Sequence, residues 1–303
     1  MSTLVIGTGL LGSALLRKGG NNMVALRHIP WGDPVAARDL IATAVQQHVA
    51  RTADWSIAWC AGAGIVGSEE SHLRQETSYL STVLDTSAAA ATGPGRLVLT
   101  SSAGGVHGRG SPDRIDERTA PDPVSAYGRN KVVQEQLVTR WAAATGNAAL
   151  IARPSNIYGP GQHLGKAQGL VTQILWRSIT HQPIVLSVPE ETQRDFVYVD
   201  DVASRMLQWL RSSPSGAVDL RVMAAGRSIT LSRLFSLSRH ITGLEPRIIR
   251  AAPAQPGLQP LQLRFRSTAS ATDGPSTPIE VGMAATWRHL VVSFGRSGLQ
   301  QPA

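Results

Sequence analysis

The sequence holds a single cysteine, Cys60, among its 303 residues. One cysteine cannot form a disulfide within the chain, and the cysteine clusters of structural zinc sites are missing as well. A chain with so little cysteine is typical of the cytoplasm, where thiols stay reduced. We therefore expect a cytoplasmic protein without a structural metal site.

Long hydrophobic runs are also lacking. No apolar stretch has the length that crosses a bilayer, and the N-terminus has neither the basic flank nor the cleavage site of a signal peptide. Hydrophobic residues make up 42% of the chain and charged residues 17%, which is ordinary for a globular protein. A chain of this length buries a sizeable core, as one large domain or two unequal lobes, and we expect no membrane partner.

Lysine is scarce, with only Lys18, Lys131 and Lys166 against 26 arginines, and the net charge is +8. Residues 1–204 carry 17 basic and 17 acidic side chains, so the whole excess lies in residues 205–303. An arginine-favouring genome explains this, and so does a C-terminal lobe that receives an anion such as a nucleotide diphosphate. A nucleic-acid surface is the third interpretation. The arginines are scattered and no nucleic-acid-binding motif accompanies them, so we expect no nucleic-acid partner.

Strand-like and helix-like segments alternate through residue 152. We expect strands over 3–6, 23–26, 54–60, 96–100 and 148–152, and helices over 9–18, 70–91 and 125–145. This alternation predicts an α/β fold, a Rossmann-type doubly wound parallel sheet, with a smaller C-terminal substrate-binding lobe. We assign residues 1–160 to an NAD(P)-binding Rossmann domain and residues 161–303 mainly to the substrate lobe, parts of which could rejoin the sheet.

The later part of the chain is less regular. We expect helices over 169–180 and 277–292, a strand over 196–199, and a helix that Asp200 caps and that runs to about Arg211. Residues 251–278 hold five prolines and few apolar runs. They are expected to form a surface loop that helps to select the substrate.

A GxGxxG motif, Gly7 to Gly12 (GTGLLG), stands between the first expected strand and the first expected helix. Its glycines allow a tight turn and let a pyrophosphate approach the helix N-terminus, although a purely structural turn is the alternative. We predict that the cofactor is bound by the motif and by the end of the third strand, at Gly7, Gly9, Leu10, Leu11, Gly12, Ala61 and Gly62.

The end of the second strand carries Arg27, followed by His28, where NAD-preferring folds usually place an acid. An arginine there could pair with a 2′-phosphate, so NADP is slightly favoured over NAD. The alternative is that Arg27 stacks on the adenine or faces solvent.

Tyr127 and Lys131 form a YxxxK pair at the start of an expected helix, and their i, i+4 spacing puts them on one face. An ammonium beside a phenol favours the phenolate and makes tyrosine a usable acid or base near neutral pH. Ser101 and Ser102 close the strand before this helix, and a hydroxyl there could hydrogen-bond a reacting oxygen, although a strand-end serine is more often a turn or cap residue. Tyr127 and Lys131 are therefore candidates for proton transfer, and Lys131 also counts among the predicted cofactor contacts.

Five segments together resemble the extended short-chain dehydrogenase/reductase superfamily, in its NAD-dependent epimerase/dehydratase branch that acts on nucleotide sugars. They are GTGLLG at 7–12, LVLTSSAGGVHG at 97–108, AYGRNK at 126–131, ARPSNIYGPGQ at 152–162 and RDFVYVDDVA at 194–203. The resemblance implies that Ser102, Tyr127 and Lys131 form a catalytic triad, with Ser101 as the fallback for the serine. It also implies that Asn156 and Arg194, together with Ser102, bind the substrate, and that the protein is a homodimer. Without it, Asn156 would be read as a turn cap and Arg194 as a partner of Asp195 or Asp200.

Two departures from the family pattern bear on the reaction. Ala103 and Gly104 follow the serine where dehydratases carry an acid pair, so we expect no dehydration. The asparagine that the family often places early in its fourth helix is replaced, by Thr77 or Ser78. An epimerase and a keto-reductase acting on a nucleotide sugar both remain open. The alternatives are a reductase of a non-sugar carbonyl compound and a non-catalytic dinucleotide sensor, which would have no use for the YxxxK pair.

Overall fold

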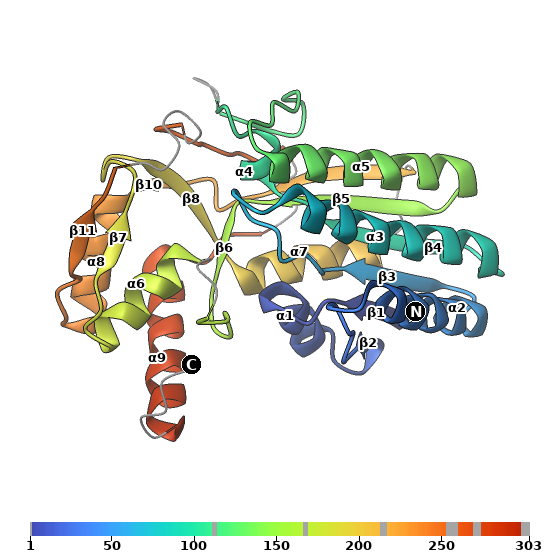
Figure 1. Cartoon of the computed structure of the whole chain (residues 1–303), viewed down its shortest axis with the longest axis horizontal. Coiled ribbons are helices and arrows are strands. Elements are labelled where there is room, and N and C mark those ends of the chain that lie inside the picture. The colour runs from blue at the N-terminus through green and yellow to red at the C-terminus, as the bar shows by residue number, and fades with distance from the viewer. Residues whose placement is uncertain are drawn as a thin grey trace.

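The computed structural model describes residues 2–110, 114–165, 169–212, 217–252, 260–268 and 274–297. Figure 1 shows two lobes, a larger one built on a central sheet with helices on both of its faces and a smaller one that carries the C-terminal helix. The predicted α/β architecture with a smaller C-terminal lobe is confirmed.

The central sheet has six parallel strands in the order β2-β1-β3-β4-β5-β9. Its strands are β1 (Ser2–Ile6), β2 (Met23–Leu26), β3 (Trp55–Trp59), β4 (Gly95–Thr100), β5 (Ala148–Pro154) and β9 (Val218–Met223). The first five lie where the sequence predicts them. The sixth was not predicted, and it comes from the part of the chain beyond residue 160. The division of the chain at residue 160 stays a prediction.

The helices of the larger lobe form two layers. One layer consists of α1 (Leu10–Gly19) and α7 (Val199–Arg211), which pack on each other, and the other of α2 (Pro34–Arg51), α3 (Glu70–Ala90) and α5 (Ala126–Thr145). Two shorter helical turns complete the lobe, η1 (Gly20–Asn22) and α4 (Ala103–Val106).

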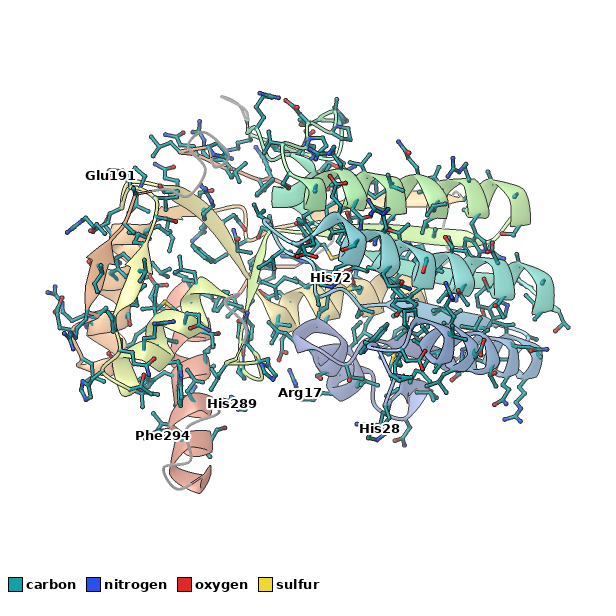
Figure 2. All side chains as sticks on the ribbon, in the orientation of Figure 1. Arg17, His28, His72, Glu191, His289 and Phe294 are labelled. Carbon is teal, nitrogen blue, oxygen red and sulfur yellow. The ribbon has the colours of Figure 1, made fainter. Side chains whose placement is uncertain are left out.

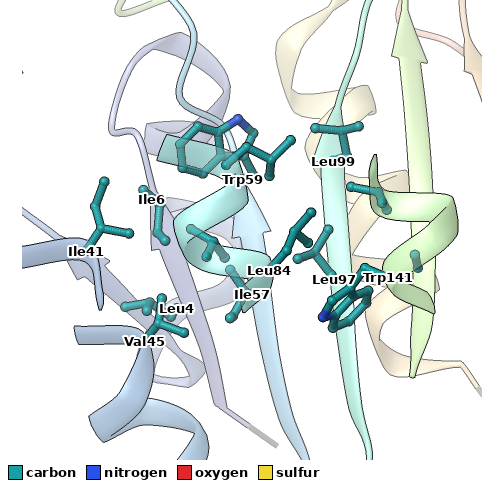
Figure 3. Close-up of a cluster of buried hydrophobic side chains, with 14 of the residues drawn as sticks. Leu4, Ile6, Ile41, Val45, Ile57, Trp59, Leu84, Leu97, Leu99 and Trp141 are labelled. Atoms are coloured by element: carbon teal, nitrogen blue, oxygen red, sulfur yellow. The ribbon is translucent and has the colours of Figure 1, made fainter. Parts of the chain in front are cut away.

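Both faces of the sheet are buried, as the alternation of side chains along β4 shows. Leu97 and Leu99 belong to the cluster beneath α2, α3 and α5, whereas Val98 between them belongs to the cluster beneath α1 and α7. Figure 3 shows the first cluster, in which Leu97 lies near Leu84 and Trp141, and Leu99 lies further along β4. Successive side chains of a strand point to opposite faces, so a strand covered on both sides is apolar throughout.

In the part of the chain that the structure describes, the smaller lobe contains two short sheets and three helices. Figure 1 shows it beside the larger lobe. The strands β10 (Ser228–Thr230), β8 (Gln193–Tyr198) and β6 (Asn156–Tyr158) form one sheet, and β11 (Ile248–Arg250) and β7 (Ile184–Leu186) form the other. Around a third apolar cluster lie α6 (Leu170–Ile179), α8 (Leu231–Thr242) and α9 (Ile279–Ser297). The sequence predicts α6 and α9 but not α8.

Two expectations for individual segments need correction. Asp200 does not cap α7, because the helix begins at Val199 and its N-cap is Tyr198; Asp200 lies in the first turn and forms an ion pair with Arg17 of α1. Helix α2 was missed, although Asp33 accepts hydrogen bonds from two backbone amides of its first turn and a proline follows at its first position. Aspartate at the N-cap with proline next to it is a start signal that the sequence does contain.

The expected loop over 251–278 falls partly outside the described residues, which here comprise 251–252, 260–268 and 274–278. Residues 260–268 run as an extended segment that makes single bridges to the rest of the molecule, at Gln262 with Gln193 and at Phe265 with Ile115. Within the residues that the structure describes, no helix is long and apolar enough to cross a membrane.

Two valines of α2 test the packing of the sheet face. Val45 is 0% exposed in the core cluster, whereas Val35 in the same helix is 60% exposed. We expect Val45→Ala to lower the free energy of unfolding by about 2 kcal/mol, because it removes buried methyl groups and leaves a cavity. Val35→Ala should change it by less than about 0.5 kcal/mol. Urea unfolding of both variants measures the difference, and equal losses would contradict the assigned core.

Candidate active site

Two neighbouring hollows open at the carboxyl ends of the central strands, where open α/β sheets bind their ligands. The first, which we call the glycine hollow, has a volume of about 490 Å³ and is lined by residues that include Gly7, Thr8, Gly9, Trp31, Ala61, Gly62, Gly64, His72, Glu76 and Tyr79. The second, the serine–tyrosine hollow, has about 280 Å³ and is lined by residues that include Gly64, Ser102, Tyr127, Ser155, Asn156, Arg194, Pro260 and Leu263. Figure 2 labels His72 at the end of α3 that is turned towards the smaller lobe.

The glycine motif forms the turn between β1 and α1. Gly7 has a φ of 96°, and a Cβ atom there would overlap the backbone of Ala61, so only glycine fits. A Cβ atom at Gly12 would overlap the carbonyl oxygen of Gly7, which shows how tightly α1 sits on the turn. At Gly9, the N-cap of α1, a Cβ atom would meet no atom within 4 Å. The N-terminus of α1 therefore faces open space, as anion binding requires.

The other predicted cofactor residues lie around this turn. Ala61 and Gly62, directly after β3, line the glycine hollow, and Leu10 and Leu11 line an adjoining part of the same crevice. Arg27 is exposed directly after β2. All of these residues are at the carboxyl edge of the sheet, and their role as cofactor contacts stays a prediction.

Tyr127 lies in the first turn of α5, which Ser125 caps by accepting a hydrogen bond from the Gly128 amide at 3.0 Å. Its ring is held between two glycines. A Cβ atom at Gly105 would lie 2.8 Å from the ring atom Cε1, and one at Gly64 would lie 3.3 Å from Cδ2. Larger residues at these positions would displace the ring, so the glycines fix where the phenol can stand.

The two serines after β4 have different surroundings. Ser102 caps α4, and its Oγ accepts a hydrogen bond from the Gly105 amide at 3.1 Å. A hydroxyl that accepts from the backbone keeps its own proton for another acceptor, so Ser102 can donate to an oxygen in the hollow. Ser101 is buried and donates instead to Glu135 Oε1 at 2.5 Å. The geometry favours Ser102 over the fallback Ser101.

Ser101 belongs to a buried hydrogen-bond network of polar and charged side chains. Arg153 of β5 donates to both carboxylate oxygens of Glu135, at 2.9 and 2.6 Å, and its Nη1 lies 3.2 Å from His107 Nε2. Burial, helped by the charge of Arg153, lowers the pKa of His107 to about 4, so the imidazole is neutral at pH 7. The network fixes the segment between β4 and α4, and therefore the position of Ser102.

Lys131 is nearly fully buried one turn after Tyr127, and its Nζ lies 5.8 Å from the centre of the tyrosine ring. The ammonium donates to Glu76 Oε1 at 2.9 Å and to Gln134 Oε1 at 3.0 Å. Burial acts to lower the pKa of Lys131, but the carboxylate of Glu76 more than offsets it and the pKa lies above its usual range. Burial likewise acts to raise the pKa of Glu76, and Lys131 holds it below its usual range. Both groups are charged at pH 7.

Glu76 is a site residue that the sequence analysis missed. Of the expected replacements for the family's asparagine, Ser78 donates to the Gln75 carbonyl at 3.0 Å. Thr77 donates to Asn130 at 2.8 Å and accepts from Gln134 Nε2 at 3.3 Å, so it reaches Lys131 only through Gln134. Glu76 lies on the buried stripe of α3, which also carries Leu73, Leu80 and Val83. A carboxylate on an otherwise apolar helix stripe is the signal that could have identified it.

Asn156 on β6 and Arg194 on β8 both line the serine–tyrosine hollow together with Ser102 and Tyr127. The structure thus brings these four residues together, and their contact with a substrate stays a prediction. The Asn156 amide donates to the Asp195 carbonyl at 2.8 Å, and Arg194 Nη1 donates to the Gln193 carbonyl at 2.8 Å. Burial lowers the pKa of Arg194 to about 10, so it stays a cation at pH 7.

The two aspartates considered as partners of Arg194 are engaged by other groups. Asp195 is fully buried and accepts hydrogen bonds from the Ser155 hydroxyl and from the amides of Ala225 and Arg227, at 2.5, 2.9 and 3.0 Å. Asp200 pairs with Arg17. The Asp195 carboxylate thus ties β8 to the segment after β9, next to the hollow.

The segment over 260–268 reaches the same hollow through Pro260 and Leu263. Glu117 anchors its far end, because its carboxylate accepts from the Ser267 hydroxyl and from the amide and hydroxyl of Thr268, each at 2.8 Å. Part of the expected substrate-selecting loop therefore lines the same hollow as Tyr127 and Arg194.

The chemistry of the crevice rests on oxygen and nitrogen groups. Burial raises the pKa of the Cys60 thiol to about 12, so it is a poor nucleophile. Across the described parts of the chain, no group of three or more histidine, cysteine, aspartate or glutamate side chains is arranged to hold a metal ion.

Comparison with known sequences gives several partial matches. The dTDP-L-rhamnose 4-epimerase of Burkholderia thailandensis is 33% identical over 141 residues, which cover 45% of this chain and 38% of that protein. The putative UDP-glucose 4-epimerase of Methanocaldococcus jannaschii is 26% identical over 62% of this chain and 60% of its own length. The dTDP-4-dehydro-6-deoxyglucose reductase of Escherichia coli is 30% identical over 46% of this chain and 43% of its own length. The matched part thus spans less than two thirds of each relative.

Solved structures match over almost the whole chain. UDP-glucose 4-epimerase from Thermotoga maritima, solved with UDP-glucose, has a TM-score of 0.83 at 20% identity, over 97% of this chain and 99% of that one. MoeE5, in complex with UDP-glucuronic acid and NAD, has a TM-score of 0.80 at 20% identity, over 97% of this chain and 100% of that one. At such identities the likeness concerns the fold. A family model matches residues 4–221, and the chain belongs to the NAD dependent epimerase/dehydratase family.

Proposed function

We propose that the chain is an NAD(P)-dependent epimerase or keto-reductase that acts on one carbon of a nucleotide-linked sugar. The observation that carries this proposal is the meeting of Tyr127, Ser102, Asn156 and Arg194 around one hollow that adjoins the glycine turn. The sequence relatives support it, because they include both 4-epimerases and reductases of nucleotide-linked sugars.

The glycine hollow fits a dinucleotide. The space above Gly9 leaves room for a pyrophosphate at the N-terminus of α1, and Gly7, Ala61 and Gly62 let backbone approach it closely. When bound, a nicotinamide dinucleotide would accept or supply a hydride. Gly7, Gly9, Ala61, Gly62 and Lys131 are the residues proposed to hold it, with Leu10, Leu11 and Gly12 shaping the turn.

The choice between NADP and NAD is part of the proposal. Arg27 supports NADP, since it is exposed at the end of β2 and has no acidic neighbour in the sequence before Asp33. Similar solved structures hold NAD, including MoeE5 and the UDP-glucose 4-epimerase of Thermus thermophilus. We keep a slight preference for NADP as a proposal that rests on Arg27 alone.

The roles of the polar side chains follow from their positions. Tyr127 would move the proton of the reacting oxygen, taking it from a sugar hydroxyl in an epimerase or giving it to a carbonyl oxygen in a reductase. Ser102 would donate a hydrogen bond to the same oxygen. Ala103 and Gly104, which follow Ser102, carry no carboxylate that could help to expel water from the sugar. The proposed reaction therefore includes no dehydration.

Recognition of the nucleotide part would fall to Arg194 and Asn156. A cation and a neutral amide side by side suit a diphosphate, because charge-assisted hydrogen bonds to phosphate oxygens are strong. A reductase of a non-sugar carbonyl compound would not need this pair, and a dinucleotide sensor would need neither it nor Tyr127. The cytoplasmic location and the homodimer that the family resemblance implies remain proposals.

Replacing Tyr127 with Phe tests the proposed chemistry directly. Turnover on a panel of UDP-, dTDP- and GDP-linked sugars should fall roughly 10²–10⁴-fold, the usual contribution of general acid–base catalysis, while dinucleotide binding persists. Tyr198→Phe is the control, since Tyr198 lies on β8 and lines neither hollow. Activity of Tyr127→Phe within about threefold of wild type would contradict the assignment.

Arg27 should decide the cofactor. Arg27→Asp places a carboxylate where a 2′-phosphate would bind and offers an acceptor to the ribose hydroxyls of NAD. Calorimetry should show weaker NADP binding, with NAD binding equal or tighter. A wild-type protein that already binds NAD more tightly than NADP would disprove the preference before any variant is made.

Arg194 should act on the nucleotide rather than on the reacting carbon. Arg194→Ala should raise KM for a nucleotide sugar about ten- to a hundredfold, the loss expected for one charge-assisted hydrogen bond. It should affect a small uncharged carbonyl substrate much less. Arg233→Ala, which alters an exposed arginine of α8, is the control. Equal losses on both substrates would mark Arg194 as structural.

A further inference from the structure

A carboxylate that the family resemblance does not assign stands in the wall between the two hollows. Glu76 is 9% exposed, and its Oε1 accepts hydrogen bonds from Lys131 Nζ at 2.9 Å and from Gln134 Nε2 at 3.0 Å. A Cβ atom at Gly62 would lie 3.1 Å from the same oxygen, so the backbone of the glycine hollow passes directly beside it. The Glu76 side chain extends from α3, accepts hydrogen bonds from α5 and lies against the turn after β3, so its position is fixed.

Two buried ion pairs lie next to Tyr127. Lys131 is balanced by Glu76, and Glu135, one turn further along α5, is balanced by Arg153 of β5. The other titratable groups of these walls are Arg194, a cation that lines the serine–tyrosine hollow, His107, which is neutral at pH 7, Cys60, whose thiol stays protonated, and Tyr79 and His72, which line the glycine hollow. Lys131 therefore acts on Tyr127 as one half of a neutral pair and not as a lone ammonium.

A nearby negative charge makes every loss of a proton harder. This holds for the Tyr127–Lys131 pair whichever of the two groups gives up the first proton, because both losses make the site more negative. With Glu76 present, the pair loses its first proton at a higher pH than it would otherwise. Removing the charge of Glu76 should therefore favour the phenolate over the phenol.

We propose that Glu76 is a positioning residue that neutralises Lys131 and keeps Tyr127 as a phenol, the form that serves reduction of a keto group. The O–H bond of Tyr127 breaks and its proton passes to the carbonyl oxygen, while the adjacent carbon gains the hydride that a bound reduced nicotinamide dinucleotide would supply. A proton from solvent then converts the phenolate back to the phenol. This inference rests on the proposed function and selects the reductase within it. An epimerase would need the phenolate at the start, to remove the proton of an alcohol.

The test removes the charge and keeps the shape. In Glu76→Gln, ionisation of Tyr127 should move to lower pH by about one unit or more, as expected for charges a few ångströms apart at an effective dielectric of ~20. The ionisation is followed by the ultraviolet absorbance of the phenolate in the full chain, with the same background carrying Tyr127→Phe subtracted. No turnover is needed for this measurement.

Three further variants separate charge from structure. Glu76→Asp keeps the charge and should leave the ionisation close to that of wild type, and Glu76→Asn removes the charge in a smaller side chain and should repeat the shift of Glu76→Gln. Glu70→Gln, in the same helix but exposed and paired with Arg74, should cause no shift. The high-pH limb of the reduction rate should move with the absorbance titration.

Each outcome decides one question. An unchanged ionisation of Tyr127 in folded Glu76→Gln and Glu76→Asn would overturn the role of Glu76, as would an equal shift in Glu70→Gln. A wild-type protein that turns over no nucleotide sugar would instead overturn the proposed function, and the absorbance titration would still report on Glu76. Thermal melting monitored by circular dichroism identifies any variant that does not fold.

Discussion

The burial of the parallel sheet on both faces determines the rest of the molecule. The strands gain stability only if helices cover each side, as Leu97 and Val98 illustrate by entering opposite clusters. Each connection then has to cross over the sheet, so every parallel strand ends at the same edge. That constraint brings the glycine turn after β1, Ser102 after β4 and Asn156 after β5 together at one crevice, although the chain separates them widely.

The charged groups buried in this crevice are stable because each has a partner. Arg153 with Glu135 and Lys131 with Glu76 are ion pairs within 3 Å, and Asp195 is held by a hydroxyl and backbone amides. A buried charge without such partners would cost several kcal/mol. The partners also restrict movement, so the candidate catalytic side chains are held in place before any ligand arrives.

The sequence predicts the fold well where a segment carries its own signal. The first five strands, α3, α5 and the motif turn were found because apolar runs end at glycines and the motifs have fixed spacing. Helix α2 was missed because its buried residues, Ala37, Ile41, Val45 and Val49, are few among small and polar neighbours. Strand β9 was missed for another reason, since its place depends on pairing with β5, which no local pattern encodes.

The same distinction applies to the site. Tyr127, Lys131 and Ser102 were named from motif spacing, and the structure brings them together, whereas their catalytic roles stay predictions. Glu76 was missed because its contact with Lys131 exists only when α3 packs against α5, and no local sequence pattern encodes that tertiary contact. Asp200 was misassigned because an acid in the first turn of a helix looks the same in the sequence whether it caps the helix or pairs with Arg17 on another one.

The position of β9 has a consequence for synthesis of the chain. Strand β5 pairs with β4 on one side and with β9 on the other, and β9 ends only at Met223. While the ribosome adds the residues between them, β5 is an apolar strand with one open edge, and such edges pair readily with other chains. Protection of the nascent protein by chaperones is therefore needed most between the emergence of Pro154 and that of Met223, and a truncation inside this interval would aggregate and not yield a smaller stable domain.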